Sequence, residues 1–250
     1  MFRKKKIQLV MREKPKLTEV RINKFISQSG ICSRREADKL IKKGFVHVNG
    51  EKCLTLGAKI KIEDKVEVNG KIVSPERKVY ILLNKPKDFI TTKKDTHNRK
   101  TVFDLLKGIK ERVFYVGRLD RHTTGLLLFT NDGEVAKKLS HPSHRIKKIY
   151  SVLIDRNLDE INLNKIKKGL IIDDELIKVD KINFLDSRKE IGIEIHMGKN
   201  RIVRKIFESI GYKVKKLDRV VFGPLTKKDL PRGKWRKLSN VEIRNIKFFK

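Results

Sequence analysis

The sequence has few cysteines and lacks any long uninterrupted apolar run. Cys32 and Cys53 are the only two cysteines in 250 residues. They are too few for a disulfide framework, and neither belongs to a CxxC motif. No segment approaches the roughly 18 apolar residues that cross a bilayer. The basic N-terminal stretch lacks the apolar core and cleavage site of a signal peptide. We therefore expect a cytoplasmic protein with no membrane association.

Motifs for cofactors and metals are also missing. The sequence contains no P-loop and no glycine-rich dinucleotide motif. His141 and His144 are close in sequence, but they lack cysteine partners and a suitable second pair of ligands. We expect neither a cofactor nor a metal ion.

Acidic residues are scarce: 30 Asp and Glu stand against 62 Lys and Arg, giving a formal net charge of +32. Such a field attracts polyanions, and phosphate contacts would give salt-sensitive affinity for nucleic acid. The chain is rich in Lys, Ile and Asn throughout, however, so a biased genome would produce part of this excess. Charge alone does not identify the partner.

With 38% hydrophobic residues, the chain is long enough for a small domain and a larger one. We expect a basic disordered arm at 1–17, a compact module at 18–74 and a polar linker at 75–78. A larger domain follows at 79–250.

The module at 18–74 has signals for two helices followed by short strands. Thr18 is a candidate cap for a first helix that ends at Gly30. The string Ser-Arg-Arg-Glu at 33–36 is a capping box for a second helix, which Gly44 ends. Two Asn-Gly pairs, at 49–50 and 69–70, predict hairpin turns. The module is therefore a small α+β unit.

The larger domain alternates strand-like and helix-like segments without a regular βαβ rhythm. We expect an α+β fold with a mixed, largely antiparallel sheet flanked by helices. The expected strands are 79–85, 114–120, 125–132, 149–154, 190–197 and 213–225, and the expected helices are 101–109, 134–141, 160–170 and 202–212.

Arg34 and Arg35 lie in the first turn of the second expected helix. Cations there oppose the helix dipole, but free N–H groups beside guanidinium groups suit a phosphate. Taken alone, the pair could equally be two solvated arginines. The string RINKFISQSGICSRREADKLIKKGFVHVNG, at 21–50, closely resembles the S4 RNA-binding domain. The resemblance implies RNA binding by Arg34, Arg35, Lys42 and Lys43, although S4 domains occur in several unrelated RNA proteins.

Asp120 lies in the segment VGRLDRHTTGLLLFTNDG, between two apolar strands. An aspartate in a loop is more often a turn residue than a nucleophile. Its neighbours Arg118 and Arg121 favour the ionised carboxylate that a nucleophile needs, and the rigid strands would hold it in place.

The same segment resembles the signature of pseudouridine synthases, GRLD followed by TTGLLLLTNDG. Four further segments resemble motifs of the RsuA/RluB group in the same order: LNKPKDFITT, HPSHRIKKIYSV, GKNRIVRKIFESIGYKVKKLDRVVFGPL and DLPRGKWRKL. The resemblance spans about residues 18 to 240. It implies an enzyme that converts a uridine in ribosomal RNA to pseudouridine, a reaction without redox change or energy input.

The resemblance also implies roles for individual residues. Asp120 would attack C1′ of the ribose or C6 of the base, or would stabilise charge at C1′, and Arg204 would pair with it. Tyr150 would stack on the uracil, and Val203 would pack on its other side. Arg118 would fill the gap left by the flipped nucleotide.

Asn200 and Arg201, within the third motif, are further RNA-binding candidates. Three positions depart from the family pattern: Asp88 replaces a usual Gly, Ile202 replaces a usual Gln, and Lys147 occupies a commonly acidic position. None of them removes a candidate catalytic group.

Two classes of function remain open: the enzyme, and a noncatalytic S4-type factor for ribosomal RNA assembly. The combination of Asp120, Tyr150 and Arg204 favours the enzyme, because a pure binder needs no carboxylate amid phosphates. The form of the sequence favours large-subunit RNA, as for enzymes of the RluB type, with RluF next. Small-subunit RNA and tRNA are the alternative targets. We expect a monomer.

Overall fold

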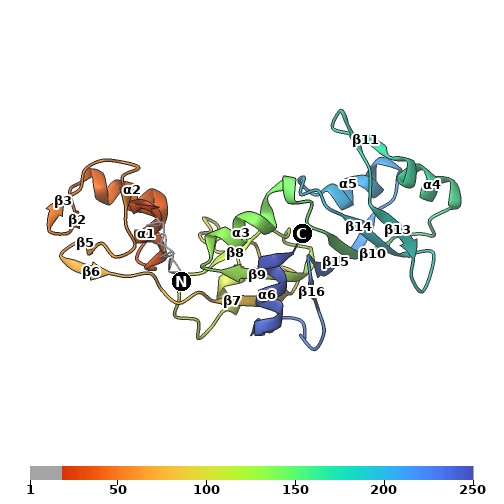
Figure 1. The fold of residues 1–250 in the computed structure, drawn as a ribbon. Helices are drawn as coiled ribbons and strands as arrows, with labels where there is room; N and C mark the ends of the chain where they lie inside the picture. The colour runs from red at the N-terminus through yellow and green to blue at the C-terminus, as the bar shows by residue number, and fades with distance from the viewer. Residues whose placement is uncertain (1–18, 250) are drawn as a thin grey trace, which may run out of the picture. The chain divides into compact units, whose positions relative to one another are not determined.

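The computed structural model describes residues 19–249, so the expected arm at 1–17 and the expected cap Thr18 lie outside the described residues. The chain divides into two compact units between Glu76 and Arg77, within the segment 75–78 where the sequence predicts the linker. Unit 1 ends at Glu76, and unit 2 begins at Arg77 (Figure 1).

Unit 1 contains two helices, and its first helix begins later than expected. Residues 20–21 are extended because strand β1 pairs with β4, with Val20 opposite Ile60. The second helix has the predicted capping box, in which the hydroxyl of Ser33 accepts from the N–H of Glu36 and the Glu36 carboxylate accepts from the N–H of Ser33. The elements are β1 (Val20–Arg21), α1 (Ile22–Gln28), α2 (Arg34–Lys42) and β4 (Lys59–Ile60).

A small sheet completes unit 1, with strand order β3-β2-β5-β6. Its two hairpins turn at the predicted Asn-Gly pairs, and all four turn residues have positive φ, as a type I′ turn requires. Apolar residues of both helices and of β2 and β5 form one core. The S4-like arrangement of two helices and short strands is confirmed. The strands are β2 (Val46–Val48), β3 (Glu51–Lys52), β5 (Val66–Val68) and β6 (Lys71–Val73).

Unit 2 is built on a sheet with strand order β13-β14-β10-β15-β9-β7-β17, in which β16 also pairs with β15 and β8 with β9. The β9–β15 pair is parallel and the other pairs are antiparallel. The expected α+β fold with a mixed, largely antiparallel sheet is therefore confirmed. Its strands are β7 (Tyr80–Lys85), β8 (Phe114–Val116), β9 (Thr124–Thr130), β10 (Lys148–Ile154), β13 (Lys181–Phe184), β14 (Glu190–Ile195), β15 (Val214–Phe222), β16 (Leu225–Thr226) and β17 (Trp235–Lys237).

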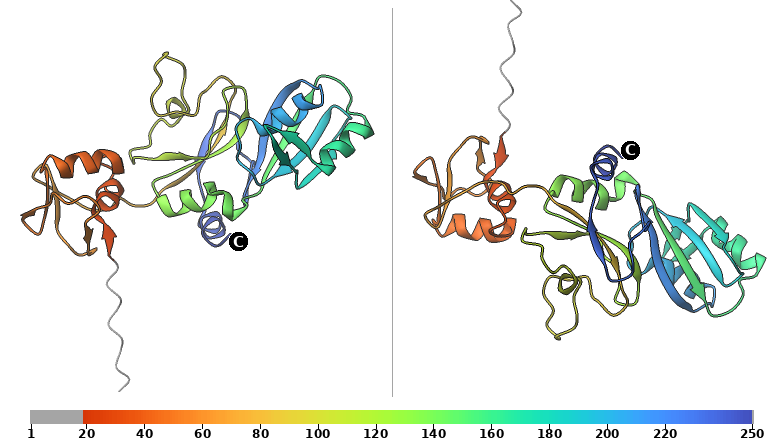
Figure 2. Two further views of the ribbon diagram at one scale, coloured as in Figure 1. Left: turned by 90° about the horizontal axis from the view of Figure 1, so that it is seen from above. Right: turned by 90° about the horizontal axis from the view of Figure 1, so that it is seen from below.

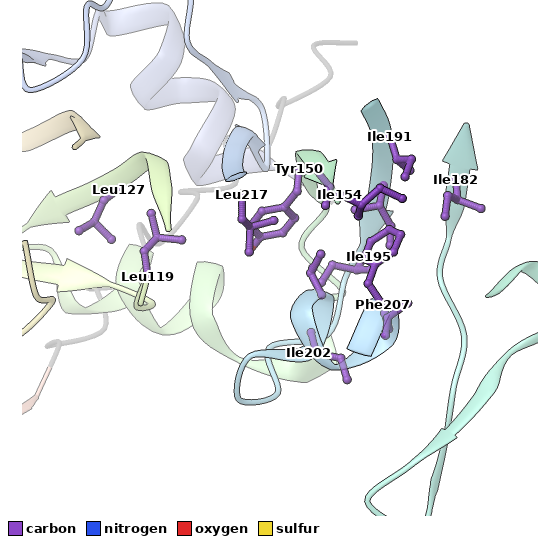
Figure 3. Packing of buried hydrophobic residues seen from close by; sticks show 14 of the residues in the cluster. Leu119, Leu127, Tyr150, Ile154, Ile182, Ile191, Ile195, Ile202, Phe207 and Leu217 are labelled. Carbon is purple, nitrogen blue, oxygen red and sulfur yellow. The ribbon is translucent and has the colours of Figure 1, made fainter. Parts of the chain in front are cut away.

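Helices cover the sheet of unit 2 in two groups. Helices α3 and α6 lie together over the end that contains β7 and β9 (Figure 2), where Leu82, Leu126 and Ile246 share one apolar cluster. Helices α4 and α5 pack on β10, β13 and β14 through a second cluster, part of which Figure 3 shows. The helices are α3 (Gly133–Ser140), α4 (Glu160–Lys168), α5 (Ile202–Ser209) and α6 (Asn240–Phe248).

Several segments of unit 2 differ from the sequence expectation. The helix expected at 101–109 is a single 3₁₀ turn at Val102–Leu105. The acidic pair Asp173–Asp174 is a turn, as the sequence indicates, but it joins two strands that were not expected, β11 (Leu170–Ile172) and β12 (Glu175–Ile177). Strands β13 and β17 and helix α6 were not expected.

Candidate active site

Asp120 lies in the loop that joins β8 to β9, and it lines a cavity of 290 Å³ in unit 2. This volume is at the lower end of the range for small-ligand pockets, about 300 Å³. The Asp120 side chain is 37% exposed, so it is accessible from the cavity. Other site residues expected from the sequence line the same cavity: Arg118, Tyr150, Asn200, Arg201 and Val203.

A buried lysine, which was not expected from the sequence, holds the Asp120 loop. Lys85 is the last residue of β7 and is fully buried. Its Nζ donates to the carbonyls of Asp120 at 3.1 Å, Thr123 at 2.8 Å and Arg121 at 3.3 Å. Burial lowers the pKa of Lys85 to about 8, while the Asp120 and Asp88 carboxylates oppose that shift. Lys85 is the first lysine of the NKPK string. That string indicated a resemblance to the family, but it did not show that Lys85 is buried against the Asp120 loop.

Two further contacts fix the same loop. The Thr91 hydroxyl donates to the carbonyl of Leu119 at 2.7 Å. The backbone N–H of Asp88 donates to the carbonyl of Arg121 at 2.9 Å, and the Asp88 carboxylate pairs with Arg121. Asp88 has a φ of 68°, a left-handed conformation that Asp tolerates better than most residues. The replacement of the usual Gly therefore keeps a glycine-like turn.

Tyr150 forms an apolar wall of the cavity. It is 8% exposed on β10, in the same apolar cluster as Ile195 and Ile202 (Figure 3). Val203, which is 3% exposed on α5, lines the cavity as well. A planar ring placed here would therefore meet aromatic and aliphatic surfaces.

The arginine that pairs with Asp120 is Arg201, not Arg204. Arg201 precedes α5 with a φ of 49°, and its Nη1 lies 3.9 Å from Oδ2 of Asp120. Both side chains are more than a third exposed, so the pair is weak. Among the described residues, no ion pair joins Arg204 to Asp120.

Arg204 lies one turn further along α5 and is 7% exposed. It donates to the carbonyls of Val214 at 3.0 Å and His122 at 3.4 Å, and its Nε has no hydrogen-bond partner among the described residues. Burial, followed by the nearby charge of Arg201, lowers the pKa of Arg204, and Asp120 opposes this. Arg204 thus contacts the backbone of the Asp120 loop and lines a second cavity of 750 Å³.

Two more cations in the Asp120 cavity were missed from the sequence. Arg219 on β15 is 2% exposed, and Lys148 on β10 is partly buried. Arg219 is the cross-strand partner of Tyr150, so both side chains lie on the same face of the sheet. Lys148 and Arg219 each lie in a segment that resembles a family motif. Their spacing in the sequence did not show that β10 and β15 bring them together.

In unit 1, Arg34 and Arg35 are exposed at the start of α2, with Lys42 and Lys43 at its other end. Arg34 donates to the buried Asn23 of α1 at 3.2 Å, and Asn23 donates to Asp38 at 2.9 Å. These bonds tie the two helices together and orient the Arg34 guanidinium at the surface.

Within residues 19–249, no group of three or more His, Cys, Asp and Glu side chains is arranged to hold a metal ion. In the same part of the chain, no helix combines the length and apolar character needed to cross a membrane.

Comparison with known proteins agrees with both units. Residues 79–209 match the family model of RNA pseudouridylate synthases, and residues 20–66 match the S4 domain. An uncharacterised RNA pseudouridine synthase of Aquifex aeolicus is 43% identical, over 92% of this chain and 94% of that protein. The ribosomal large subunit pseudouridine synthase B of Bacillus subtilis is 40% identical, over 91% and 95%.

The dual-specificity RNA pseudouridine synthase RluF of Escherichia coli is 36% identical, over 90% of this chain and 78% of that protein. A crystal structure of a pseudouridylate synthase superposes with a TM-score of 0.65 at 27% identity, covering 91% of this chain and 99% of the other. Each of these proteins matches 90% or more of this chain. The chain therefore belongs to the RNA pseudouridine synthase family and carries an N-terminal S4 domain.

Proposed function

We propose that this protein converts a specific uridine of large-subunit ribosomal RNA to pseudouridine, with Asp120 as its nucleophile. The observation that supports this most strongly is the position of Asp120: its carboxylate lines a cavity whose walls include Tyr150 and Val203. A flipped uracil would stack on these walls and present its glycosidic bond to the carboxylate.

The proposed reaction moves one bond and one proton. The N1–C1′ bond breaks, the uracil turns within the cavity, and C5 bonds to C1′ while its proton is lost and N1 is protonated. Asp120 attacks either C1′ or C6; both routes require a carboxylate at the base and a wall that retains the detached ring. Lys85 and Arg204 position the loop through its backbone carbonyls.

The proposed RNA contacts lie on both units. Arg118, Asn200 and Arg201 are exposed where the cavity opens, and Arg118 fills the gap left by the flipped nucleotide. In unit 1, the basic residues of α2 and its C-cap would bind phosphates of structured RNA: Arg34, Arg35, Lys42 and Lys43. We propose that the protein works in the cytoplasm as a monomer on ribosomal RNA.

The choice of large-subunit RNA is supported by the name of the Bacillus subtilis relative. Small-subunit RNA and tRNA are the alternative targets within the same activity. A noncatalytic S4-type assembly factor is the alternative outside it, and the retained Asp120 cavity argues against that alternative.

The test is to map pseudouridines in all ribosomal RNA and tRNA of a strain that lacks this gene, complemented with wild type or with Asp120→Asn. We expect one or a few large-subunit positions to lose the modification, to regain it with wild type and to remain unmodified with Asp120→Asn. The variant should bind RNA with an affinity close to wild type. Restored modification by Asp120→Asn would refute the nucleophile, and a lost tRNA or small-subunit site would refute the target.

A further inference from the structure

Arg219 is a buried arginine that lines the cavity holding Asp120, and one of its donors is unused. It is 2% exposed; its Nε donates to the carbonyl of Leu126 at 2.8 Å, and its guanidinium carbon lies 4.6 Å from the centre of the Phe222 ring. Its Nη2 has no hydrogen-bond partner among the described residues. A buried cationic N–H group without an acceptor destabilises the protein unless a ligand supplies the acceptor.

Lys148 adds a second positive charge to the same cavity. Its Nζ donates to the carbonyl of His196 at 2.7 Å, and burial, followed by the charge of Arg219, lowers the pKa of Lys148 to about 8. In the described part of the chain, neither Arg219 nor Lys148 has a carboxylate within ion-pair distance. The cavity therefore holds positive charge that no protein group neutralises by direct contact.

The other walls indicate which ligand would bring the negative charge. Tyr150 is the cross-strand partner of Arg219, and Ile202, Val203 and Leu217 also line the cavity. These apolar surfaces suit a flat ring with polar atoms at its edge, whereas a phosphate is tetrahedral and strongly hydrated. A pyrimidine ring that carries negative charge on its carbonyl oxygens fits both the walls and the cations.

We propose that Arg219 is a catalytic residue whose guanidinium donates to a carbonyl oxygen of the uracil and stabilises the negative charge that the base gains. This inference rests on the proposed function and deepens it. When the N1–C1′ bond breaks, its electron pair stays on the uracil, and the charge spreads over N1 and the two carbonyl oxygens. Addition of Asp120 to C6 also moves an electron pair into the ring and onto a carbonyl oxygen. Arg219 would stabilise the negative charge in both routes. That charge is neutralised when C5 bonds to C1′ and N1 takes up a proton.

The first test needs no RNA. Barbiturate is a flat pyrimidine that is an anion at neutral pH, and uracil is its neutral counterpart. Ligand-observed NMR titrations at pH 7 should show that wild type binds barbiturate at least about tenfold more tightly than uracil, as a charge-assisted hydrogen bond predicts. Arg219→Gln should reduce this preference by about tenfold, and Lys148→Gln by a smaller factor.

Arg188→Gln is the matched control, because it removes one guanidinium that is not part of the cavity and packs on the Phe184 ring. Arg188→Gln should keep the wild-type preference for barbiturate over uracil. This control separates the local effect of Arg219 from the effect of losing one positive charge anywhere in the protein. Equal preference in wild type and Arg219→Gln, or no barbiturate binding by wild type at millimolar concentration, would overturn the inference. This result does not depend on turnover, so it is distinct from a failure of the proposed function.

The second test measures the chemical step on a large-subunit ribosomal RNA transcript under single-turnover conditions. Arg219→Gln should slow conversion by roughly 10²- to 10³-fold, as the loss of one charge-stabilising donor does, with RNA affinity changed by less than about twofold. Fluorescence of the single tryptophan, Trp235, reports whether the variant is folded. If it is not, Arg219→Lys keeps the charge on a single nitrogen but lacks the planar fork that reaches the Leu126 carbonyl and the uracil from different nitrogens, so it should also lower the rate. An unchanged rate in a folded variant would contradict the catalytic role of Arg219.

Discussion

Positively charged side chains are buried around the candidate active site of unit 2. Lys85, Arg204 and Arg219 are each less than a tenth exposed, and Lys148 is partly buried beside them. A buried charge is unfavourable unless other groups solvate it. Backbone carbonyls do this for Lys85 and in part for Arg204, whose Nε has no partner among the described residues, and both side chains donate to the Asp120 loop. Arg219 is also only partly satisfied, and it lines the Asp120 cavity itself, which leaves it available to a ligand.

Lys85→Met should weaken the Asp120 loop more than the rest of the fold. The substitution keeps an apolar chain but removes the donor to three loop carbonyls, so hydrogen exchange in residues 119–123 should accelerate. We expect the free energy of unfolding to fall by about 1–3 kcal/mol. The single-turnover rate should fall by roughly 10²-fold, because small displacements of Asp120, the proposed nucleophile, are costly. Lys87→Met, at an exposed position two residues later, should behave like wild type. Equal rates for the two variants would contradict this role for Lys85.

The pKa of Lys148, about 8, predicts opposite pH effects on activity and stability. The Lys148 charge is lost as pH rises through about 8, so turnover should decline above that pH. The folded-state pKa lies below the ordinary value of 10.5, so the unfolded chain binds more protons between the two values. Stability should therefore rise with pH over this window.

Lys148→Arg, which stays charged, should move the decline in activity to higher pH. Lys148→Met should show a smaller rise of stability between pH 8 and 10 than wild type does. Pre-steady-state rates and urea unfolding between pH 6 and 10 measure the two effects. A Lys148→Arg profile identical to that of wild type would show that another group controls the decline.

At the scale of elements, the parallel contact between β9 and β15 brings Arg219 into the cavity. Gly125 on β9 lies opposite Arg219. It has a φ of 107°, and a Cβ atom there would lie 2.3 Å from the Arg219 carbonyl oxygen. Only glycine permits both this conformation and this approach. The contact thus explains the glycine that follows the two threonines of the Asp120 segment.

Gly125→Ala should separate β9 from β15 and lower the free energy of unfolding by about 2–4 kcal/mol, through backbone strain and steric overlap together. Gly70→Ala is the matched control: its φ is also positive, at 73°, but a Cβ there meets no atom within 4 Å. That variant should lose only about 1–2 kcal/mol, from strain alone. Chemical denaturation compares the two, and equal losses would argue against the close approach.

Helix α2 carries a prediction about RNA binding. Arg34 and Arg35 are exposed at its first turn, so their replacement by Ala should weaken RNA binding. The slope of log K against log salt should become shallower by up to about 2, one for each lost phosphate contact. Replacement of the exposed Lys61 and Lys71 of the same unit provides the control with equal charge loss. A slope that changes equally in both double variants would point to net charge rather than to the helix.

At the scale of the whole molecule, the contacts of the chain divide it into two units, each with its own apolar core. A fragment of residues 77–250 should therefore fold alone, with a cooperative unfolding transition. It should bind ribosomal RNA at least about tenfold more weakly than the full chain, because a tethered second binding site raises overall affinity. Calorimetry and filter binding test this. A fragment that fails to fold would refute the independence of the two units.

Local signals in the sequence determined much of this protein. The capping box at Ser33, the two Asn-Gly turns and the apolar strand periodicities are decided by interactions within a few residues, and the structure has them. The family motifs identified Asp120, Tyr150 and Val203 as site candidates from the sequence alone, and all three line one cavity. Thr18 was a misleading signal for the start of α1, because the pairing of β1 with β4 across about 40 residues keeps the chain extended up to Arg21.

Only the tertiary structure decided which charges meet. Arg201 and Arg204 are three residues apart and look alike in sequence. Arg201 pairs with Asp120, whereas Arg204 donates to the carbonyls of Val214 and His122. Lys85, Lys148 and Arg219 come from three strands whose order in the sheet differs from their order in the sequence. Local patterns specify elements through short-range hydrogen bonds and packing. Long-range strand pairing brings side chains from distant segments together around one cavity.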